Sequence, residues 1–306
     1  MATLLAILST PRTTGFTASL WRAAVEAAEA EGVEVDAVSL ADFSFGPCRS
    51  CYACIRSPKH VCPLPDDMGR AGRGRLFARV ARANALLIAE PVHCWGNAAA
   101  THLFVERLYP FGWSGLLNGM PFGSIGCAGN QGMQHLSAEG LCKWAFTMCL
   151  RYLGEVSAHA FDLKRATREA GRLGRRLARA ARRDAEGRRT WSELARYRAY
   201  RKTVWDPYPH YLDNLTAGTR SYDESLIARA LASGVFTNPE AAQLLRRAAE
   251  ELRRCLRADG AGEEGAALRH LVKAGAFWTH ATWKQLLEED VIGVATPAAY
   301  RPLSSR

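Results

Sequence analysis

Four cysteines stand close together early in the chain, at Cys48, Cys51, Cys54 and Cys62, and Pro63 follows the last of them. Two residues separate the first from the second and the second from the third, and seven precede the fourth. Thiolates spaced in this way can curl around one centre, and such compact runs of four are typical of iron–sulfur clusters. Structural zinc sites more often use two separated cysteine pairs. The pattern favours a cluster over zinc, and a cysteine-rich loop without metal is the remaining alternative.

A second group of polar residues follows the first apolar run of the chain. Residues 9–17 contain Thr10, Arg12, Thr14 and Thr17, directly before a segment with helical periodicity. Hydroxyls, a guanidinium and the N-terminus of a helix together favour a bound anion such as a phosphate. The loop lacks the Gly-Lys-Ser/Thr of a Walker A loop and the G-x-G-x-x-G of dinucleotide-binding folds. An ordinary capped turn with an exposed arginine is the alternative.

Two further loops have compositions suited to a flat ligand. Residues 90–97 read Glu-Pro-Val-His-Cys-Trp-Gly-Asn, and residues 127–134 include Gly129 and Gly132. A large aromatic residue can support a ring, and glycines let backbone donors approach a ligand closely. Either loop taken alone is explained as well by a tight strand-to-helix turn, in which Asn97 caps the following helix.

The elements that must position these loops alternate regularly over the first half of the chain. Strands are predicted at 2–8, 33–40, 85–90, 121–127 and 155–161, with helices at 18–31, 67–83, 97–108 and 137–153. Apolar runs at this spacing predict an α/β fold with a doubly wound, five-stranded parallel sheet in residues 1–162. Ligands of such sheets bind beyond the carboxyl ends of the strands, where the three loops would meet.

The second half of the chain has a different character. Helices are predicted at 163–183, 238–257 and 264–289, and prolines interrupt the aromatic segment 191–215. We therefore predict a C-terminal α-helical extension or a small helical domain over 163–306. Its many aromatic residues exceed what the sheet domain needs, which favours an interface or a lid and a homo-oligomer, a dimer or a tetramer.

The net charge of +10 is concentrated in one segment. Residues 163–202 contain 15 Lys and Arg but only four acids, so the rest of the chain sums to −1. A basic helix can bind nucleic acid, an anionic membrane or an acidic electron-transfer partner. No helix-turn-helix or zinc-finger spacing accompanies it. We expect a solvated helix whose Leu163, Leu173 and Leu177 pack on the core, and no nucleic-acid binding.

The overall composition excludes several classes of protein. Of the 306 residues, 48% are apolar and 23% charged, which excludes a wholly disordered chain. No apolar run approaches the roughly 18–20 residues of a membrane helix. The opening MATLLAILST has no basic flank and is predicted to be a buried strand rather than a signal peptide. We expect a cytoplasmic protein without a membrane partner.

Taken together, the three loops are more specific than each alone. T-P-R-x-x-G-x-T, P-V-x-x-x-G-N and G-x-x-G follow the first, third and fourth strands. In this order they resemble the NAD(P)H-dependent FMN reductase group of the flavodoxin-like superfamily, over about residues 2–161. The resemblance implies FMN at the carboxyl end of the sheet. It assigns the phosphate to Thr10, Arg12, Thr14 and Thr17, the isoalloxazine to Pro91, His93, Trp95, Gly96 and Asn97, and the flank of the ring to Gly129 and Gly132.

The sequence departs from the group at three positions of these loops. Ser9-Thr10 stands where Gly-Ser is frequent, Phe16 where Asn is frequent, and His93 where Tyr is frequent. A threonine can replace a serine as a donor, but Phe16 removes one polar contact to the phosphate.

The cysteine spacing after the second strand resembles that of the iron–sulfur flavoproteins of the same superfamily. Those proteins carry FMN and a [4Fe–4S] cluster held by four such cysteines. The resemblance therefore implies a cluster on loop 46–66, with Cys48, Cys51, Cys54 and Cys62 as its ligands. The gap of seven residues before Cys62 is at the long end of that family's range.

The prediction for function is an FMN-dependent oxidoreductase that moves electrons to or from a small-molecule substrate. NAD(P)H and a ferredoxin-type protein are the candidate electron donors, and His93, expected beside the flavin ring, is the best candidate for proton transfer. Three alternatives stay open: an FMN-only NAD(P)H-dependent reductase of quinones, nitro or azo compounds, a ferredoxin-like electron carrier, and a redox-sensing regulator that binds nucleic acid.

Overall fold

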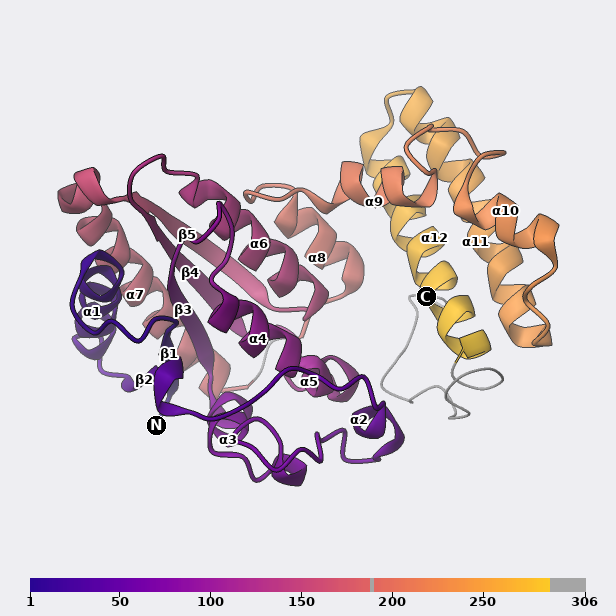
Figure 1. Cartoon of the computed structure of the whole chain (residues 1–306). Coiled ribbons are helices and arrows are strands. Elements are labelled where there is room, and N and C mark those ends of the chain that lie inside the picture. Colours follow the sequence, from indigo (N-terminus) through magenta and orange to yellow (C-terminus); the bar gives the residue numbers. More distant parts are fainter. Residues whose placement is uncertain (188–189, 287–306) are drawn as a thin grey trace. The chain divides into compact units, whose positions relative to one another are not determined.

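The computed structural model describes residues 1–187 and 190–286. The chain divides into two compact units (Figure 1). The first unit comprises Met1–Trp191 with Thr203–Trp205, and the second comprises Ser192–Lys202 with the residues from Asp206 onward.

The first unit is built on one parallel sheet. Its strands are β1 (Thr3–Leu8), β2 (Glu34–Ser39), β3 (Ala85–Pro91), β4 (Pro121–Ala128) and β5 (Arg151–His159). They pair in the order β2-β1-β3-β4-β5, and every neighbouring pair is parallel. This is the strand order of flavodoxin, so the predicted doubly wound, five-stranded sheet is confirmed.

Helices cover both faces of the sheet. On one face lie α1 (Phe16–Glu29) and α7 (Leu163–Ala185), whose buried side chains share one apolar core with β1, β3 and β4. On the other lie α3 (Arg75–Arg82), α4 (Ala99–Arg107) and α6 (Gln134–Thr147) (Figure 1). The shorter helical segments of this unit are α2 (Ala53–Arg56), α5 (Tyr109–Ser114), η1 (Leu40–Asp42), η2 (Arg70–Gly72) and η3 (Ala160–Asp162).

The basic helix α7 belongs to the sheet unit, which corrects the predicted boundary at residue 162. Leu173 and Leu177 are buried in the core, as expected of a helix with one apolar face. Gly174 lets α7 approach α1 closely, because a Cβ there would lie 2.0 Å from the carbonyl oxygen of Ala24. The face that α1 covers needs a second helix, and α7 supplies it, so the first unit continues to about Trp191.

Two predicted helices are shorter in the structure. The helix expected at 67–83 begins only at Arg75. Gly69 and Gly74 lie in the loop before it, where a Cβ would come within 2.1 Å and 2.4 Å of backbone oxygens of Leu64 and Asp67. The helix expected at 137–153 ends at Thr147, and β5 begins at Arg151 rather than at 155.

The second unit is helical. Its helices are α8 (Glu193–Tyr200), α9 (Pro207–Leu215), α10 (Leu226–Ser233), α11 (Pro239–Gly260) and α12 (Glu264–Lys284). The helices predicted from 238 and 264 are confirmed, although residues 287–289 of the second lie outside the described residues. Pro207 does not interrupt a helix but starts α9, whose first turn is capped by Asp206.

Aromatic residues of this unit fill its own interior. Tyr197, Tyr200 and Phe277 are 1–4% exposed, and the ring of Tyr211 lies edge-on to that of Tyr197 at a centroid distance of 6.2 Å. The premise that these aromatics exceed the needs of the fold is therefore wrong for the buried ones, because the helical unit has a core of its own.

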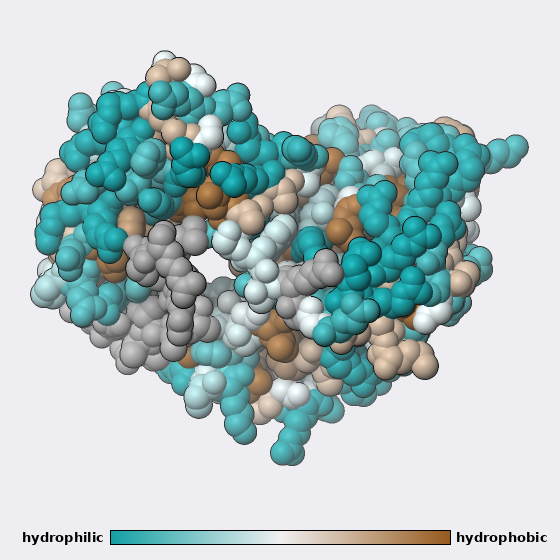
Figure 2. All heavy atoms as spheres, turned by 180° about the vertical axis from the view of Figure 1, so that it is seen from behind, coloured by the Kyte–Doolittle hydropathy of each residue, from teal (hydrophilic) through white to brown (hydrophobic). Residues whose placement is uncertain are grey.

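Polar side chains dominate one face of the molecule. On the face shown in Figure 2, hydrophilic residues cover most of the surface and hydrophobic ones form small separate patches. Within residues 1–187 and 190–286, no helix is both long and apolar enough to cross a membrane. Some of the basic side chains of α7 have partners, since Arg179 and Arg182 both bond with Glu31.

Candidate active site

The three predicted flavin loops meet at one edge of the sheet. Because β1, β3 and β4 are parallel neighbours, their carboxyl ends lie side by side. The amide of Ser9 donates to the carbonyl of Ala89 (2.8 Å), and that of Val92 donates to the carbonyl of Cys127 (3.0 Å). These bonds extend the sheet to the start of each loop and fix where the loops leave it.

The first loop opens toward the N-terminus of α1. Thr10 accepts a hydrogen bond from the amide of Arg12 (3.2 Å), and both Arg12 and Thr14 are exposed. Within the described part of the chain, the Arg12 guanidinium makes no hydrogen bond and no ion pair. The first turn of α1 has neither a side-chain cap nor an acidic residue. An uncapped helix N-terminus thus lies beside an exposed arginine and two threonines, which is the composition of a phosphate site.

Thr17 is placed differently from the other predicted phosphate contacts. It is 8% exposed. Burial raises the pKa of the Cys127 thiol, and the neighbouring Thr17 opposes the rise. Thr17 is therefore buried near the end of β4, whereas Arg12 and Thr14 are exposed.

The second loop forms a tight hairpin turn. The amides of His93 and Gly96 each donate to the other's carbonyl, at 3.1 and 2.9 Å. The two residues between them, Cys94 and Trp95, have φ angles of 48° and 61°. A turn with positive φ at both central positions usually holds Asn or Gly, so a cysteine and a tryptophan here hold a strained backbone. Trp95 is 54% exposed.

His93 and Pro91 bracket the start of this turn. Pro91 ends β3, and His93 is exposed at the first position of the turn. Gly96, at the other end of the turn, is half-buried. The turn thus presents an imidazole and an indole ring beyond the carboxyl edge of the sheet.

Asn97 faces inward. Its side-chain amide donates to the carboxylate of Glu90 and to the carbonyl of Ser137 (2.9 Å). A Cβ on Gly140 would lie 2.1 Å from the Asn97 Oδ1 atom, so α6 packs directly on this side chain. The predicted cap is wrong, because the N-cap of α4 is Ala98 and the Asn97 side chain instead joins the second loop to α6. The predicted contact of Asn97 with the flavin ring stays a prediction.

Glu90 is the centre of these contacts and is not among the predicted site residues. It is fully buried and accepts hydrogen bonds from Ser137 Oγ (2.5 Å), from the amide of Ala98 (3.0 Å) and from Asn97. Burial raises its pKa, while its hydrogen bonds counteract the rise. The only signal in the sequence is one acid that ends the apolar run ALLIAE.

The same network reaches the first loop. The hydroxyls of Thr101 and Ser9 hydrogen-bond at 2.7 Å, and both residues are buried. A chain of polar contacts therefore runs beneath the site from the end of β1, through α4 and β3, to α6. Buried polar groups that are fully hydrogen-bonded make a structure rigid and specific.

The third loop is open on its outer side. Gly129 and Gly132 form a turn, with the amide of Gly132 donating to the carbonyl of Gly129 (3.1 Å). A Cβ on Gly129 would meet nothing within 4 Å, whereas φ of +86° at Gly132 favours glycine there. His159 at the end of β5 contacts the carbonyl of Asn130 through Nε2 (3.1 Å) and supports the loop from below.

The other three cysteines of loop 46–66 contribute to the electrostatic environment of Cys54. Burial first, and then the neighbouring Cys62, Cys48 and Cys51, together raise the pKa of Cys54 to about 11. Cys51 is exposed and the other three are half-buried, and all four thiols are free. Within residues 1–187 and 190–286, no group of three or more His, Cys, Asp or Glu side chains lies close enough together to hold a metal ion.

Two of these sulfur atoms accept hydrogen bonds. The amide of Ser50 donates to Cys48 Sγ (3.4 Å), and Arg107 Nη2 donates to Cys62 Sγ (3.5 Å). Ser50 and Tyr52 have positive φ, so the backbone winds tightly between the first three cysteines. Four soft thiol donors, two of which accept an N–H hydrogen bond, suit an iron–sulfur cluster, which takes one thiolate on each iron rather than four on one ion.

Charged residues hold this loop against the sheet unit. Asp67 is 4% exposed and accepts hydrogen bonds from the amide of Ser44 (2.8 Å) and from two nitrogens of Arg75 (both 2.9 Å). The neighbouring Asp66 accepts hydrogen bonds from two nitrogens of Arg107, at 2.7 and 2.9 Å. Neither pair was predicted, because nothing in the local sequence shows which arginine reaches which acid.

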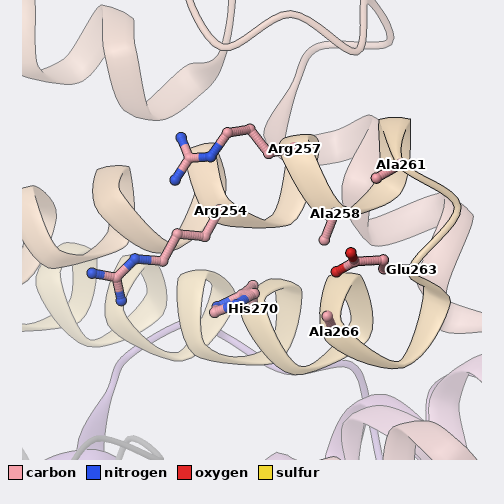
Figure 3. A pocket seen from close by; sticks show the side chains of 7 residues that line it. All are labelled: Arg254, Arg257, Ala258, Ala261, Glu263, Ala266 and His270. Atoms are coloured by element: carbon pink, nitrogen blue, oxygen red, sulfur yellow. The ribbon is translucent and has the colours of Figure 1, made fainter.

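The second unit carries a separate groove. It has a volume of about 360 Å³ and lies between α11 and α12 (Figure 3). The carboxylate of Glu251 holds Arg254 (2.9 Å) and the Nδ1 atom of His270 (2.7 Å) at one side of it. The groove offers guanidinium groups to an anion, but no predicted flavin or cysteine residue lines it; the residues that do are Arg254, Arg257, Ala258, Ala261, Glu263, Ala266 and His270.

Comparison with known protein families assigns the sheet unit. The family described as NADPH-dependent FMN reductase matches residues 2–158, just over half of the chain. The chain belongs to the NADPH-dependent FMN reductase family. The resemblance drawn from the three loops is therefore confirmed, and the match ends within β5, before α7 begins.

Two curated relatives of this flavin reductase family member are iron–sulfur flavoproteins. One, from Methanocaldococcus jannaschii, is 30% identical over 107 residues, which cover 35% of this chain and 52% of the relative. The other, from Archaeoglobus fulgidus, is 30% identical over 119 residues, 39% of this chain and 51% of the relative. The chain thus spans about half the length of each.

Solved structures with similar folds include a flavone reductase and a flavodoxin from the domain Archaea. The first is 15% identical, with coverage of 62% of this chain and 66% of the reductase and a TM-score of 0.47. The second is 14% identical, with coverage of 59% and 99% and a TM-score of 0.39. The flavodoxin-like assignment rests on the strand order itself.

Proposed function

We propose that this family member is an FMN-dependent oxidoreductase that also holds a [4Fe–4S] cluster on loop 46–66 and exchanges electrons with a small-molecule substrate. The observation that carries the proposal is the set of four free cysteines on one loop of a flavin-reductase fold, with N–H donors directed at two of the sulfurs. The names of the two iron–sulfur flavoprotein relatives support it.

The residues of the first and third loops would hold FMN. Thr10, Thr14 and Arg12 would donate to the phosphate, together with the free N–H groups at the start of α1. Gly129 and Gly132 would let the backbone lie close to the ring. Thr17 and Asn97 would act indirectly, because Thr17 is buried and the side chain of Asn97 is engaged with Glu90.

The second loop would supply contacts to the reacting face of the ring. Trp95 would shield one side of the site from water, and His93 would hold or release a proton at an imidazole nitrogen. The buried network around Glu90 fixes the start of this loop, so the two side chains would be positioned before substrate arrives. When bound, FMN exchanges electrons in pairs or singly and a cluster only singly, which would link a two-electron substrate to single-electron partners.

Further parts of the proposal concern partners. NAD(P)H is the donor that the family description favours, and a ferredoxin-type protein is the donor that a cluster would suit. Phe16, Trp95 and Phe161 follow the carboxyl ends of three strands and are 52%, 54% and 92% exposed. We propose that a second subunit covers them in a dimer or tetramer, which sedimentation of the intact protein would test.

An anaerobic reductive titration tests the proposed function. Protein prepared without oxygen is titrated with dithionite while absorbance is recorded. A chain with FMN and one cluster takes up about three electron equivalents, two at the flavin and one at the cluster. A chain with FMN alone takes up about two. Uptake of two equivalents by freshly prepared, anaerobic protein would favour the FMN-only reductase.

A second titration separates the enzyme from an electron carrier. NADPH and NADH are added in place of dithionite, and the bleaching of the flavin absorbance is followed. If the flavin absorbance bleaches after a single addition of either nucleotide, the protein is a reductase that accepts hydride donors. No bleaching with either nucleotide, together with full bleaching by a reduced ferredoxin, would indicate that a ferredoxin-type protein is the donor.

A further inference from the structure

Arg107 is a buried cation at the end of α4. Its side chain is 2% exposed and forms a salt bridge to Asp66. Its Nη1 atom donates to the carbonyl of Gly46 (2.6 Å) and to Asp66 (2.7 Å), and its Nη2 atom donates to Asp66 (2.9 Å) and to Cys62 Sγ (3.5 Å). One guanidinium thus contacts both ends of the cysteine loop and one of its sulfurs.

The burial of the Arg107 side chain is energetically costly and is not explained by packing alone. A charge taken out of water costs several kcal/mol unless its partners compensate for the lost hydration. Burial would raise the pKa of Asp66, but its hydrogen bonds with Arg107 lower it, so the carboxylate is the charged partner. The pair alone would be satisfied by the two Asp66 contacts, whereas one nitrogen is also directed at the Cys62 sulfur.

We propose that Arg107 positions Cys62 as a cluster ligand and raises the reduction potential of the cluster through its hydrogen bond to the sulfur. The inference rests on the proposed function, because it needs a cluster on this loop. A reduced cluster carries one more negative charge than an oxidised one, so a nearby cation and an N–H···S bond stabilise the reduced state. Asp66 moderates the effect by neutralising part of the charge.

The position of Arg107 also connects the two cofactor regions. It is the last residue of α4, and α4 begins directly after the second flavin loop. At its start, the amide of Ala98 is held by Glu90. The same helix is therefore fixed at the flavin edge by one buried carboxylate and holds the cysteine loop by one buried guanidinium.

Substitutions at Arg107 and Asp66 should shift the potential in opposite directions. R107Q removes the charge and keeps a polar side chain, and D66N keeps an acceptor but leaves Arg107 uncompensated. The cluster potential is measured by electron paramagnetic resonance in a redox titration of the anaerobic protein. R107Q should lower the ratio of reduced to oxidised cluster about tenfold at a fixed potential, which is about 59 mV for one electron. D66N should raise that ratio.

The matched control is R75Q. Arg75 makes the same two-nitrogen contact with Asp67, the neighbouring carboxylate, but its side chain is 63% exposed and no cysteine sulfur is among its partners in the described residues. If loosening of the loop alone changed the potential, R75Q would change it as well. We expect iron content and potential of R75Q to match those of the unmodified protein.

The outcomes separate this inference from the proposed function. Unmodified protein without iron would overturn the cluster itself. Unmodified protein with iron, together with an unchanged potential in both R107Q and D66N, would overturn the role of Arg107. If R107Q fails to retain iron, the R107K variant tests the role of Arg107 instead. Lysine keeps the positive charge but not the planar pair of donors. Retained iron with a lowered cluster potential in R107K supports the inference. An unchanged potential in R107K contradicts it.

Discussion

The flavin edge of the sheet and the cysteine loop are held in place by different means. At the flavin edge, the strand ends place the three loops, and the buried hydrogen bonds of Glu90 and Thr101 fix the first two of them. The cysteine loop contains one helix of four residues, α2, and is held mainly by the Arg107–Asp66 and Arg75–Asp67 pairs. The first region is positioned by the strands of the sheet and by buried hydrogen bonds. The second region is held in place mainly by ion pairs. The two sites should therefore respond independently to substitution and oppositely to pH.

The largest expected effect is the loss of iron from a cysteine variant. C51A removes the most exposed of the four thiols, which is remote in sequence from the three flavin loops. We expect iron to be lost completely and FMN to be retained, as measured by iron analysis and flavin absorbance after anaerobic preparation. C149A, outside the loop, is the control and should keep both. Equal loss of FMN in C51A would show that the regions are coupled.

The next effect concerns the phosphate loop. R12A removes a guanidinium that has no partner among the described residues, so we expect little change in folding. FMN binding should weaken by about 1.5–3 kcal/mol, the range for a hydrogen bond to a charged group. Fluorescence titration of FMN into the apoprotein measures this, with R168A on the exposed side of α7 as control. Unchanged affinity in R12A would place the phosphate elsewhere.

A smaller effect tests the assignment of α7 to the flavin unit. G174A places a Cβ 2.0 Å from a backbone oxygen of α1, so we expect a loss of about 1–3 kcal/mol in the free energy of unfolding. G171A on the same helix meets Ala27 at an ordinary 3.7 Å and should be neutral or slightly stabilising. Urea unfolding compares them, and equal stability of the two variants would contradict the packing of α7 on α1.

The smallest effect is a pH-dependent change in stability that has opposite signs at Asp67 and Glu90. The Arg75 hydrogen bond lowers the pKa of Asp67, although burial opposes it, so its stabilisation is present above the usual carboxyl range and is lost as pH falls through its folded value. Burial raises the pKa of Glu90, so its ionisation costs stability at neutral pH, and that cost disappears as pH falls.

Unfolding experiments on two variants measure this difference. From pH 6 to pH 3, the stability of the unmodified protein relative to D67N should fall, and its stability relative to E90Q should rise. If the relative stability changed in the same direction for both variants, the two regions would not differ in their electrostatics as we expect.

The sequence predicts the sheet and its loops well because both depend on local patterns. Apolar runs alternate with amphipathic helices, and the three loops follow strand ends. The packing of Leu173 and Leu177 on the core is predicted from their spacing. The close contact of α7 with α1 is missed, because it depends on small residues, among them Gly174, that form no apolar pattern.

The supporting residues are missed for a different reason. Glu90 and Arg107 act through partners more than 40 positions away, such as Ser137 and Asp66, and no local pattern records such contacts. The inward orientation of the Asn97 side chain is missed for the same reason, because it depends on contacts with α6. Residues that touch a ligand can be selected by their chemistry, but residues that hold them require the fold.

The composition of strictly anaerobic protein tests the central claim most directly. Iron, acid-labile sulfide and FMN are determined on the same freshly purified sample of the full chain. We predict about four iron atoms and about four sulfides for each FMN, the composition of one [4Fe–4S] cluster beside one flavin. FMN bound in the absence of iron and sulfide would contradict the account and leave loop 46–66 as a cysteine-rich loop on an FMN-only reductase.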